Sequence, residues 1–146
     1  MNSNERHVST RLHEGALVIE VNCRQLNDHD TLAEMREEIL VAMQNIQAVH
    51  VILDLRNVEL LTSAALFPFI EIREVAEREA RHIVICNVAT PVAHVLTVSQ
   101  LIVEGRSHAR HLVLTDDIPA ALAWLGEVDA ATPVAGRPKD SLVYSV

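Results

Sequence analysis

The sequence predicts an α/β fold: a mixed β-sheet of about five strands, with four helices packed mainly on one of its faces. Apolar segments of strand length alternate with amphipathic segments of helix length, in the order β-β-α-β-α-β-α-β-α. The segment 49–55, VHVILDL, is apolar at nearly every position, as expected of a strand in the middle of a mainly parallel sheet. Aromatic residues make up only 3% of the 146 residues, so Val, Leu, Ile and Ala must fill the core.

A hairpin and a long helix are expected before the central strand. Residues 7–12 alternate between polar and apolar side chains, as an edge strand does, and Gly15 lies in the turn that leads to the apolar strand 16–21. Asn27 and Asp28 have side chains suited to cap the N-terminus of the next helix. The apolar residues of that helix recur every three or four positions and form one stripe: Leu32, Met35, Ile39, Met43 and Ile46.

The helix after the central strand begins with hydroxyl residues. Thr62 and Ser63 are natural N-caps, and a helix tip of this kind leaves backbone N–H groups free for a partner. Pro68 lies beyond the first turn of a helix that begins at Ser63 or Ala64, where it cannot donate a hydrogen bond and crowds a carbonyl. The helix is therefore expected to be distorted at Pro68 or to begin later.

Two further strands and two further helices complete the expected fold. Residues 81–88 are apolar enough for a buried strand, and Pro91 stands at the favourable first position of a third helix. Residues 109–114 form the last strand, and the polar residues that follow it cap a last helix, which ends near Gly126.

These elements are expected to form one domain, residues 7–126. Trp124 and Leu125, on the last helix, are expected to pack on the same core as the other helices. Residues 1–6 are polar and are expected to be flexible. In residues 127–146, Pro, Gly and Ala take the place of a periodic pattern, so we expect a flexible tail there.

The composition argues against several classes of function. The chain has 12 Lys and Arg against 20 Asp and Glu, a net charge of −8, so it lacks the basic surface that binds nucleic acid. Its two cysteines lack the paired spacing of a zinc site, which favours a reducing compartment. No apolar run approaches the ~20 residues that span a bilayer, and the polar N-terminus resembles no signal peptide. We expect a cytoplasmic protein that binds no nucleic acid and does not insert directly into a membrane.

The sequence contains no motif of an enzyme or a cofactor site. None of the four glycines follows the strands 49–55 or 81–88, where a nucleotide-binding loop would need them. Ser63 has no G-x-S-x-G motif around it, and no pairing of a nucleophile with a base is evident. Most of the eight histidines are isolated, and His108 and His111 have no acidic or thiol ligand at a zinc spacing. We therefore expect no catalysis, no metal and no cofactor.

One stretch of the chain carries a more specific pattern. Its residues are Asp54, Leu55, Val58, Leu61, Thr62, Ser63, Ala64, Ala65 and Leu66. In this order and spacing they resemble the D-L-x-x-V-x-x-hydrophobic-D-S-S-G-L segment of the STAS domain family, which includes the anti-sigma factor antagonists. The resemblance implies a STAS fold over residues 7–126. Two positions differ, because Thr62 stands for the family's aspartate and Ala64 for the serine that is phosphorylated.

The resemblance also implies a surface that binds a partner protein, formed in the family by this helix tip and by a short loop before the first helix. The expected surface here consists of Asn27, Asp28, Thr62, Ser63, Ala64, Ala65 and Phe67. Phe67 and Phe69 cannot both lie on the buried stripe of their helix, so one of them is expected to be an exposed apolar anchor. Helix capping alone would also explain the polar side chains at both places.

As to function, the resemblance implies a module similar to anti-sigma factor antagonists, which binds a kinase-type anti-sigma factor. Because Ala64 has no hydroxyl, binding is expected to be constitutive, unless Ser63 or Thr62 accepts the phosphate instead. The alternative is a scaffold or accessory subunit of a larger assembly, either stressosome-like or part of a lipid-transport ABC system. A homodimer is compatible with both.

Overall fold

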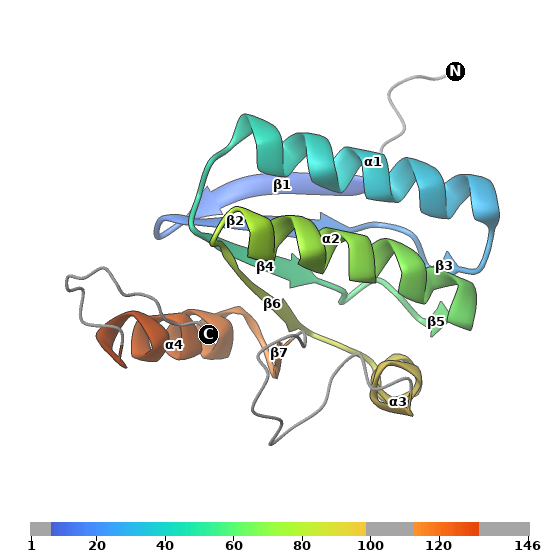
Figure 1. Cartoon of the computed structure of the whole chain (residues 1–146). Helices are drawn as coiled ribbons and strands as arrows, with labels where there is room; N and C mark the ends of the chain where they lie inside the picture. Colours follow the sequence, from blue (N-terminus) through green and yellow to red (C-terminus); the bar gives the residue numbers. More distant parts are fainter. Residues whose placement is uncertain (1–6, 99–112, 132–146) are drawn as a thin grey trace.

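The computed structural model describes residues 7–98 and 113–131 (Figure 1). Its main sheet has five strands in the order β1-β2-β4-β6-β7. They are β1 (Val8–His13), β2 (Ala16–Val21), β4 (His50–Asp54), β6 (His82–Cys86) and β7 (Val113–Thr115). β1 is antiparallel to β2, and all other neighbours are parallel. The predicted mixed sheet, with the strand from the segment 49–55 at its centre, is confirmed.

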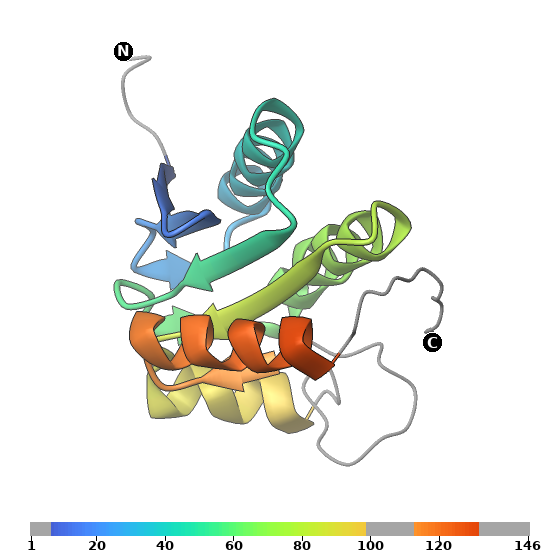
Figure 2. The ribbon, with the colours of Figure 1, turned by 90° about the vertical axis from the view of Figure 1, so that its left-hand side faces the viewer.

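Both faces of the sheet are apolar, because successive side chains of a strand point to opposite sides. In β4, Val51 and Leu53 belong to the core on one side and Ile52 to the core on the other. All three are fully buried, and each stabilises the fold by about 1.5–3 kcal/mol. Three helices contribute to the first core: α1 (His29–Asn45), α2 (Leu66–Arg78) and α3 (Thr90–Val98). Most helices therefore pack on one face, as predicted, while α4 (Ile118–Ala131) covers the other (Figure 2).

The position of α4 corrects one expectation. Leu125 and Trp124 pack in the second core with Ile118 and Ala121, and not in the core under α1 and α2. Periodicity shows that a helix has an apolar stripe but not which face of a sheet it covers. Since β2 and β4 are apolar on both faces, the second face needs a helix of its own. α4 also continues past its expected end near Gly126, because a glycine inside a helix costs only ~1 kcal/mol relative to alanine.

The other boundaries agree with the sequence to within a few residues. One difference is Val49, which is 55% exposed because β4 begins only at His50. The expected elements and flexible segments that fall on residues 1–6, 99–112 and 132–146 lie outside the described residues.

A second, two-stranded parallel sheet was not predicted. It consists of β3 (Gln25–Leu26) and β5 (Leu60–Leu61), with Leu26 opposite Leu61. After it the chain makes one turn of 3₁₀ helix, η1 (Ser63–Ala65), before α2 begins at Leu66. Pro68 therefore falls in the first turn of α2, where its missing N–H does no harm. This confirms that the α-helix begins later than its hydroxyl residues.

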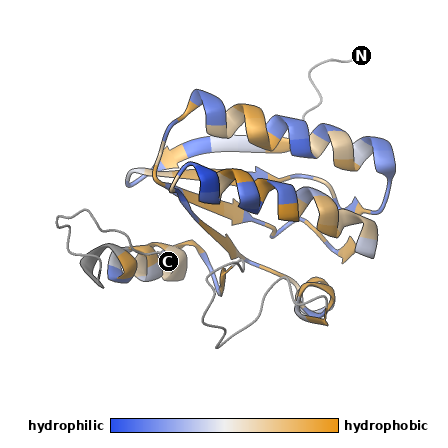
Figure 3. Ribbon diagram, in the orientation of Figure 1, coloured by the Kyte–Doolittle hydropathy of each residue, from blue (hydrophilic) through white to orange (hydrophobic). Residues whose placement is uncertain are grey.

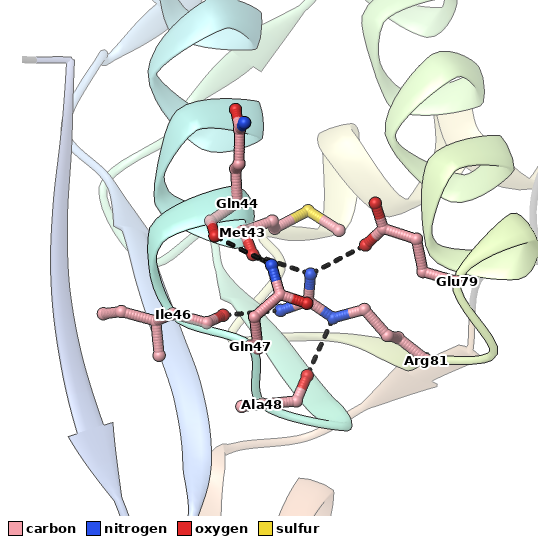
Figure 4. Close-up of polar contacts among 7 residues, drawn as sticks. All are labelled: Met43, Gln44, Ile46, Gln47, Ala48, Glu79 and Arg81. Atoms are coloured by element: carbon pink, nitrogen blue, oxygen red, sulfur yellow. Dashed lines mark hydrogen bonds and ion pairs between the residues drawn. The ribbon is translucent and has the colours of Figure 1, made fainter.

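Arg81 joins the two large helices to the sheet (Figure 4). Its buried guanidinium donates to the carbonyl oxygens of Met43 at 2.7 Å, Ile46 at 2.8 Å and Ala48 at 2.7 Å, and pairs with Glu79 at 2.9 Å. The last turn of α1 contains no basic residue, so Arg81 supplies the positive charge that a helix C-terminus favours. The outer faces of α1 and α2 are largely hydrophilic (Figure 3), as expected for two helices that bury one stripe each.

Candidate partner-binding surface

The small sheet of β3 and β5 fixes the Asn27–Asp28 loop beside the helix tip at Thr62. The N–H of Thr62 donates to the carbonyl oxygen of Leu26 at 3.2 Å, and the Thr62 hydroxyl donates to the same oxygen at 3.4 Å. Leu26 and Leu61 are buried beneath this contact. The structure therefore brings together the two places that the sequence singled out, although 36 residues separate them.

Asp28 has the capping role that its residue type favours. Its Oδ2 accepts a hydrogen bond from the N–H of Thr31 at 3.0 Å, at the start of α1. This bond holds the pKa of Asp28 below its ordinary value, so the exposed carboxylate is charged at neutral pH. Asn27 is also exposed, and its amide donates to Gln25 at 3.5 Å.

The helix tip departs from the capping alternative. Thr62 occupies the N-cap position of η1, but its side chain makes no capping bond, because its hydroxyl donates to Leu26 instead. Ser63 is exposed, and its hydroxyl makes no hydrogen bond to a described residue. Ala64 is half-buried and Ala65 fully buried against the first core. Of the expected surface, Ser63 is thus the side chain most open to solvent at the tip, while Ala65 supports the tip from below.

The two phenylalanines of α2 have opposite environments. Phe69 is the largest fully buried side chain in the described part of the chain, whereas Phe67 is 71% exposed. Phe67 is the second residue of α2, directly after the 3₁₀ turn that contains Ser63. The expectation of one buried and one exposed aromatic agrees with this placement.

A buried charge supports the chain between the main sheet and β5. The carboxylate of Asp54 accepts from the backbone N–H of Arg56 at 3.0 Å, from its guanidinium at 2.8 and 2.9 Å, and from the Asn87 amide at 3.0 Å. The same contact raises the pKa of Arg56 above its ordinary value. Asp54 and Arg56 thus close the turn after β4 and set the direction in which the chain approaches β5.

Sequence reasoning missed Leu60 and the pair formed by Arg24 and Glu59. Leu60 is 43% exposed next to the tip, while its neighbour Leu61 is buried. Arg24 pairs with Glu59 at 3.2 Å, and its carbonyl accepts the N–H groups of Glu59 and Leu60 at 2.7 and 3.2 Å. A strand of two residues is too short to show alternation, so nothing in the sequence indicates which leucine faces outward.

Over the described ranges 7–98 and 113–131, no group of three or more His, Cys, Asp or Glu side chains is arranged to hold a metal ion. Nor is any helix in those ranges long and apolar enough to cross a membrane.

Comparison with solved structures shows a shared fold. RsbS of Moorella thermoacetica is 17% identical with a TM-score of 0.64, over 84% of this chain and 97% of that one. The unphosphorylated anti-sigma factor antagonist SpoIIAA is 14% identical with a TM-score of 0.59, over 88% and 98%. A chain of the stressosome, described as a signal integration and transduction hub, is 18% identical with a TM-score of 0.60, over 82% and 97%.

At these identities the similarity shows the fold alone. Among curated proteins no match was found. A model of the STAS domain, however, matches residues 7–107, which is more than half of the chain. That match covers the segment from Asp54 to Leu66, whose pattern suggested the family, and the loop at Asn27. The chain belongs to the STAS domain family.

Proposed function

We propose that this chain is a non-catalytic regulatory module of the cytoplasm that binds a protein partner, as anti-sigma factor antagonists do, and that the partner is a kinase-type anti-sigma factor. One observation carries the proposal. The bonds between Thr62 and Leu26 join two loops into one surface, on which Asn27, Ser63 and Phe67 are exposed. The similarity in fold to SpoIIAA, an anti-sigma factor antagonist, supports the regulatory class.

The chemistry of this surface suits a protein partner better than a small substrate. Phe67 offers a large apolar side chain, and interfaces concentrate their binding energy in such aromatic anchors. The other exposed side chains at these two loops are an amide at Asn27, a charged carboxylate at Asp28 and a hydroxyl at Ser63, which suit a polar rim. The expected partner therefore has an apolar pocket for Phe67, bordered by hydrogen-bond donors for Asp28.

We further propose that this surface binds its partner constitutively. Ala64, at the position of the family's phosphorylated serine, has no hydroxyl to accept a phosphate. If phosphate is added here at all, Ser63 is a better acceptor than Thr62, because the Thr62 hydroxyl already donates to Leu26. A phosphate on Ser63 would add close to two negative charges to this surface and would disturb a contact made with the uncharged hydroxyl.

The second candidate is a scaffold within a larger assembly. It is favoured by the similarity in fold to RsbS and to a chain of the stressosome. In that case the same surface would contact other subunits, and the protein would be recovered in a large complex with many copies. The two candidates therefore differ in the size and stoichiometry of the complex, and not in the residues that contact the partner.

The test compares binding of purified anti-sigma factors of the histidine-kinase type, from the source organism, to the chain and to Phe67→Ala. Calorimetry should show a complex of defined stoichiometry, weakened in Phe67→Ala by about 2 kcal/mol, which is roughly 30-fold in Kd. Leu12→Ala is the matched control: Leu12 is also a large exposed apolar residue, but it lies on β1, away from the tip. Its affinity should equal that of the unchanged chain.

Three results would contradict the proposal. The first is no binding to any such anti-sigma factor. The second is an equal loss in Leu12→Ala and Phe67→Ala, which would mean that general hydrophobicity is responsible. The third is recovery of the chain only in a large multimeric particle, which would favour the scaffold. Mass spectrometry after incubation with the bound kinase should find no phosphate, and phosphate that Ser63→Ala abolishes would contradict constitutive binding.

A further inference from the structure

Three side chains that are far apart in the sequence form a relay next to the small sheet. The thiol of Cys23 lies 3.5 Å from Nδ1 of His7, and Nε2 of the same imidazole lies 2.7 Å from a carboxylate oxygen of Glu34. A thiol, an imidazole and a carboxylate in this order are the parts of an activated nucleophile. The pairing could not be predicted from the sequence, because the residue before β1, the loop after β2 and α1 contribute one group each.

The main chain at His7 is held from two sides. The carbonyl of His7 accepts the N–H of Asn22 at 2.8 Å, which ties it to the residue just before Cys23. The N–H of His7 donates to Glu38 at 2.9 Å, and the N–H of Val8 donates to the same oxygen at 3.1 Å. These contacts fix the main chain at His7, and the contacts with Cys23 and Glu34 then orient its imidazole.

The contact with Glu34 determines what the imidazole can do. A carboxylate accepts hydrogen bonds, so it favours the proton of a neutral imidazole on Nε2 and leaves the lone pair of Nδ1 facing the thiol. Burial, and then the nearby charge of Glu38, raise the pKa of Cys23, so the thiol is protonated at neutral pH. Such a thiol reacts only when a base removes its proton, and His7 is placed to do so.

We propose that Cys23 is a site of reversible thiol modification that takes a small neutral or cationic disulfide, with His7 as base and Glu34 as the positioning residue. The Cys23 sulfur attacks one sulfur of the disulfide while its proton passes to Nδ1 of His7. The disulfide bond breaks, and the leaving thiolate takes that proton back from the imidazolium. The products are a mixed disulfide on Cys23 and one free thiol, so atoms and electrons balance.

The class of disulfide follows from charge. Glu34 and Glu38 both contact His7, and the chain carries a net charge of −8. An anionic disulfide is repelled from this place, whereas a cationic one is attracted. The rate of modification should therefore fall in the order cystamine, hydroxyethyl disulfide, oxidised glutathione.

The modification would also reach the surface proposed above, a consequence that rests on the proposed function. Arg24 follows Cys23 directly, and its carbonyl accepts the N–H groups of Glu59 and Leu60, at the start of the small sheet. A group added to the half-buried Cys23 sulfur crowds the residues around it, and Arg24 is the next residue along the chain. Modification is therefore expected to weaken partner binding.

The test measures the rate at which cystamine adds to the purified chain, by mass spectrometry of the intact protein and of its peptides. Cys86 is the internal control: it is fully buried, and burial raises its pKa to about 12, so it should stay unmodified until the chain is unfolded. The adduct should form on Cys23 and be removed by dithiothreitol. Modification of both cysteines at one rate would overturn the proposal.

Matched variants test the relay itself. His7→Ala should slow the reaction of Cys23 by about 100-fold, the lower end of what a positioned base contributes, and added imidazole should restore part of the rate. His13→Ala, at the other end of β1, should react as the unchanged chain does. Glu34→Gln should slow the reaction less than His7→Ala, and Glu37→Gln, an exposed position on the same helix, should not slow it.

Equal rates in His7→Ala and His13→Ala, or no rescue by imidazole in a folded His7→Ala, would overturn the role of His7. Because these rates are measured without any partner, their failure leaves the proposed function untouched. If the adduct forms as expected but the modified chain binds its partner with unchanged affinity, only the link between Cys23 and the surface is wrong.

Discussion

Arg81 is a single side chain on which the packing of three elements depends. It donates hydrogen bonds to the carbonyl groups of Met43 in the last turn of α1 and of Ile46 and Ala48 just after it. It also lies directly before β6. Arg81→Met is expected to lower the free energy of unfolding by about 3 kcal/mol, because buried carbonyls lose a charged donor. Urea denaturation measures the loss. Arg78→Met, at an exposed position near the end of α2, should change it by less than about 0.5 kcal/mol, and similar losses in both would contradict this role.

Asp28 makes stability depend on pH at the acidic end. Its pKa is lower in the folded chain than in the unfolded one, so the charged cap stabilises the fold above the unfolded pKa, near pH 4. The contribution disappears as the pH falls below that value through the folded pKa. Asp28→Asn keeps a capping oxygen but no charge. Urea denaturation should therefore show the unchanged chain to be more stable than Asp28→Asn at pH 7 but not at pH 2. The same difference in the free energy of unfolding at both pH values would contradict this role of Asp28. Glu37→Gln, at an exposed position on the same helix, is the control and should not show the change with pH.

At the scale of elements, the sequence predicted those helices and strands whose apolar residues recur with a regular spacing. The hairpin, the central strand and the helices have apolar positions at a spacing of two or of three to four, so their existence and order were predictable. β3 and β5 have two residues each, which is too few for a period, and they form only because distant segments pair. The face chosen by α4 depends on which side of the sheet is still uncovered, a property of the assembled fold and not of the helix.

In the candidate site, too, local patterns predict some features, while others depend on contacts between distant segments. Thr62, Ser63 and the exposed aromatic were predictable from a local pattern and a helical stripe. The contact between Thr62 and Leu26, the outward side of Leu60 and the relay at Cys23 were not. Each of these depends on hydrogen bonds between segments that tertiary structure brings together.

The docking of α4 can be tested with the one tryptophan of the chain. Trp124 packs in the second core beside the buried Leu125. Leu125→Ala is expected to destabilise the fold by about 2–4 kcal/mol, because it leaves a cavity between α4 and the sheet. The tryptophan fluorescence of Leu125→Ala should shift to longer wavelength, because Trp124 becomes more exposed. Glu127→Ala, at an exposed position on α4, should leave both quantities unchanged. An unshifted spectrum in a destabilised Leu125→Ala would argue against this packing.

At the scale of the whole molecule, the two cores share the strands that separate them. β4 contributes Val51 and Leu53 to one core and Ile52 to the other, so neither core can lose its strand without exposing both. Unfolding is therefore expected to be cooperative. Trp124 fluorescence reports the second core, and circular dichroism at 222 nm reports mainly the helices on the first. Their midpoints in urea should coincide, and two separate transitions would show that the cores unfold independently.

The pairing of β3 with β5 also determines when conformational entropy is lost. In an unpaired loop, ordering each residue on binding would weaken a complex by about 1–2 kcal/mol. Here the bonds between Leu26 and Thr62 form as the chain folds, so that loss belongs to folding and not to association. Encounter with a partner then requires no slow rearrangement of this chain, and differences in affinity among variants of the surface are expected to arise from how quickly the complex dissociates.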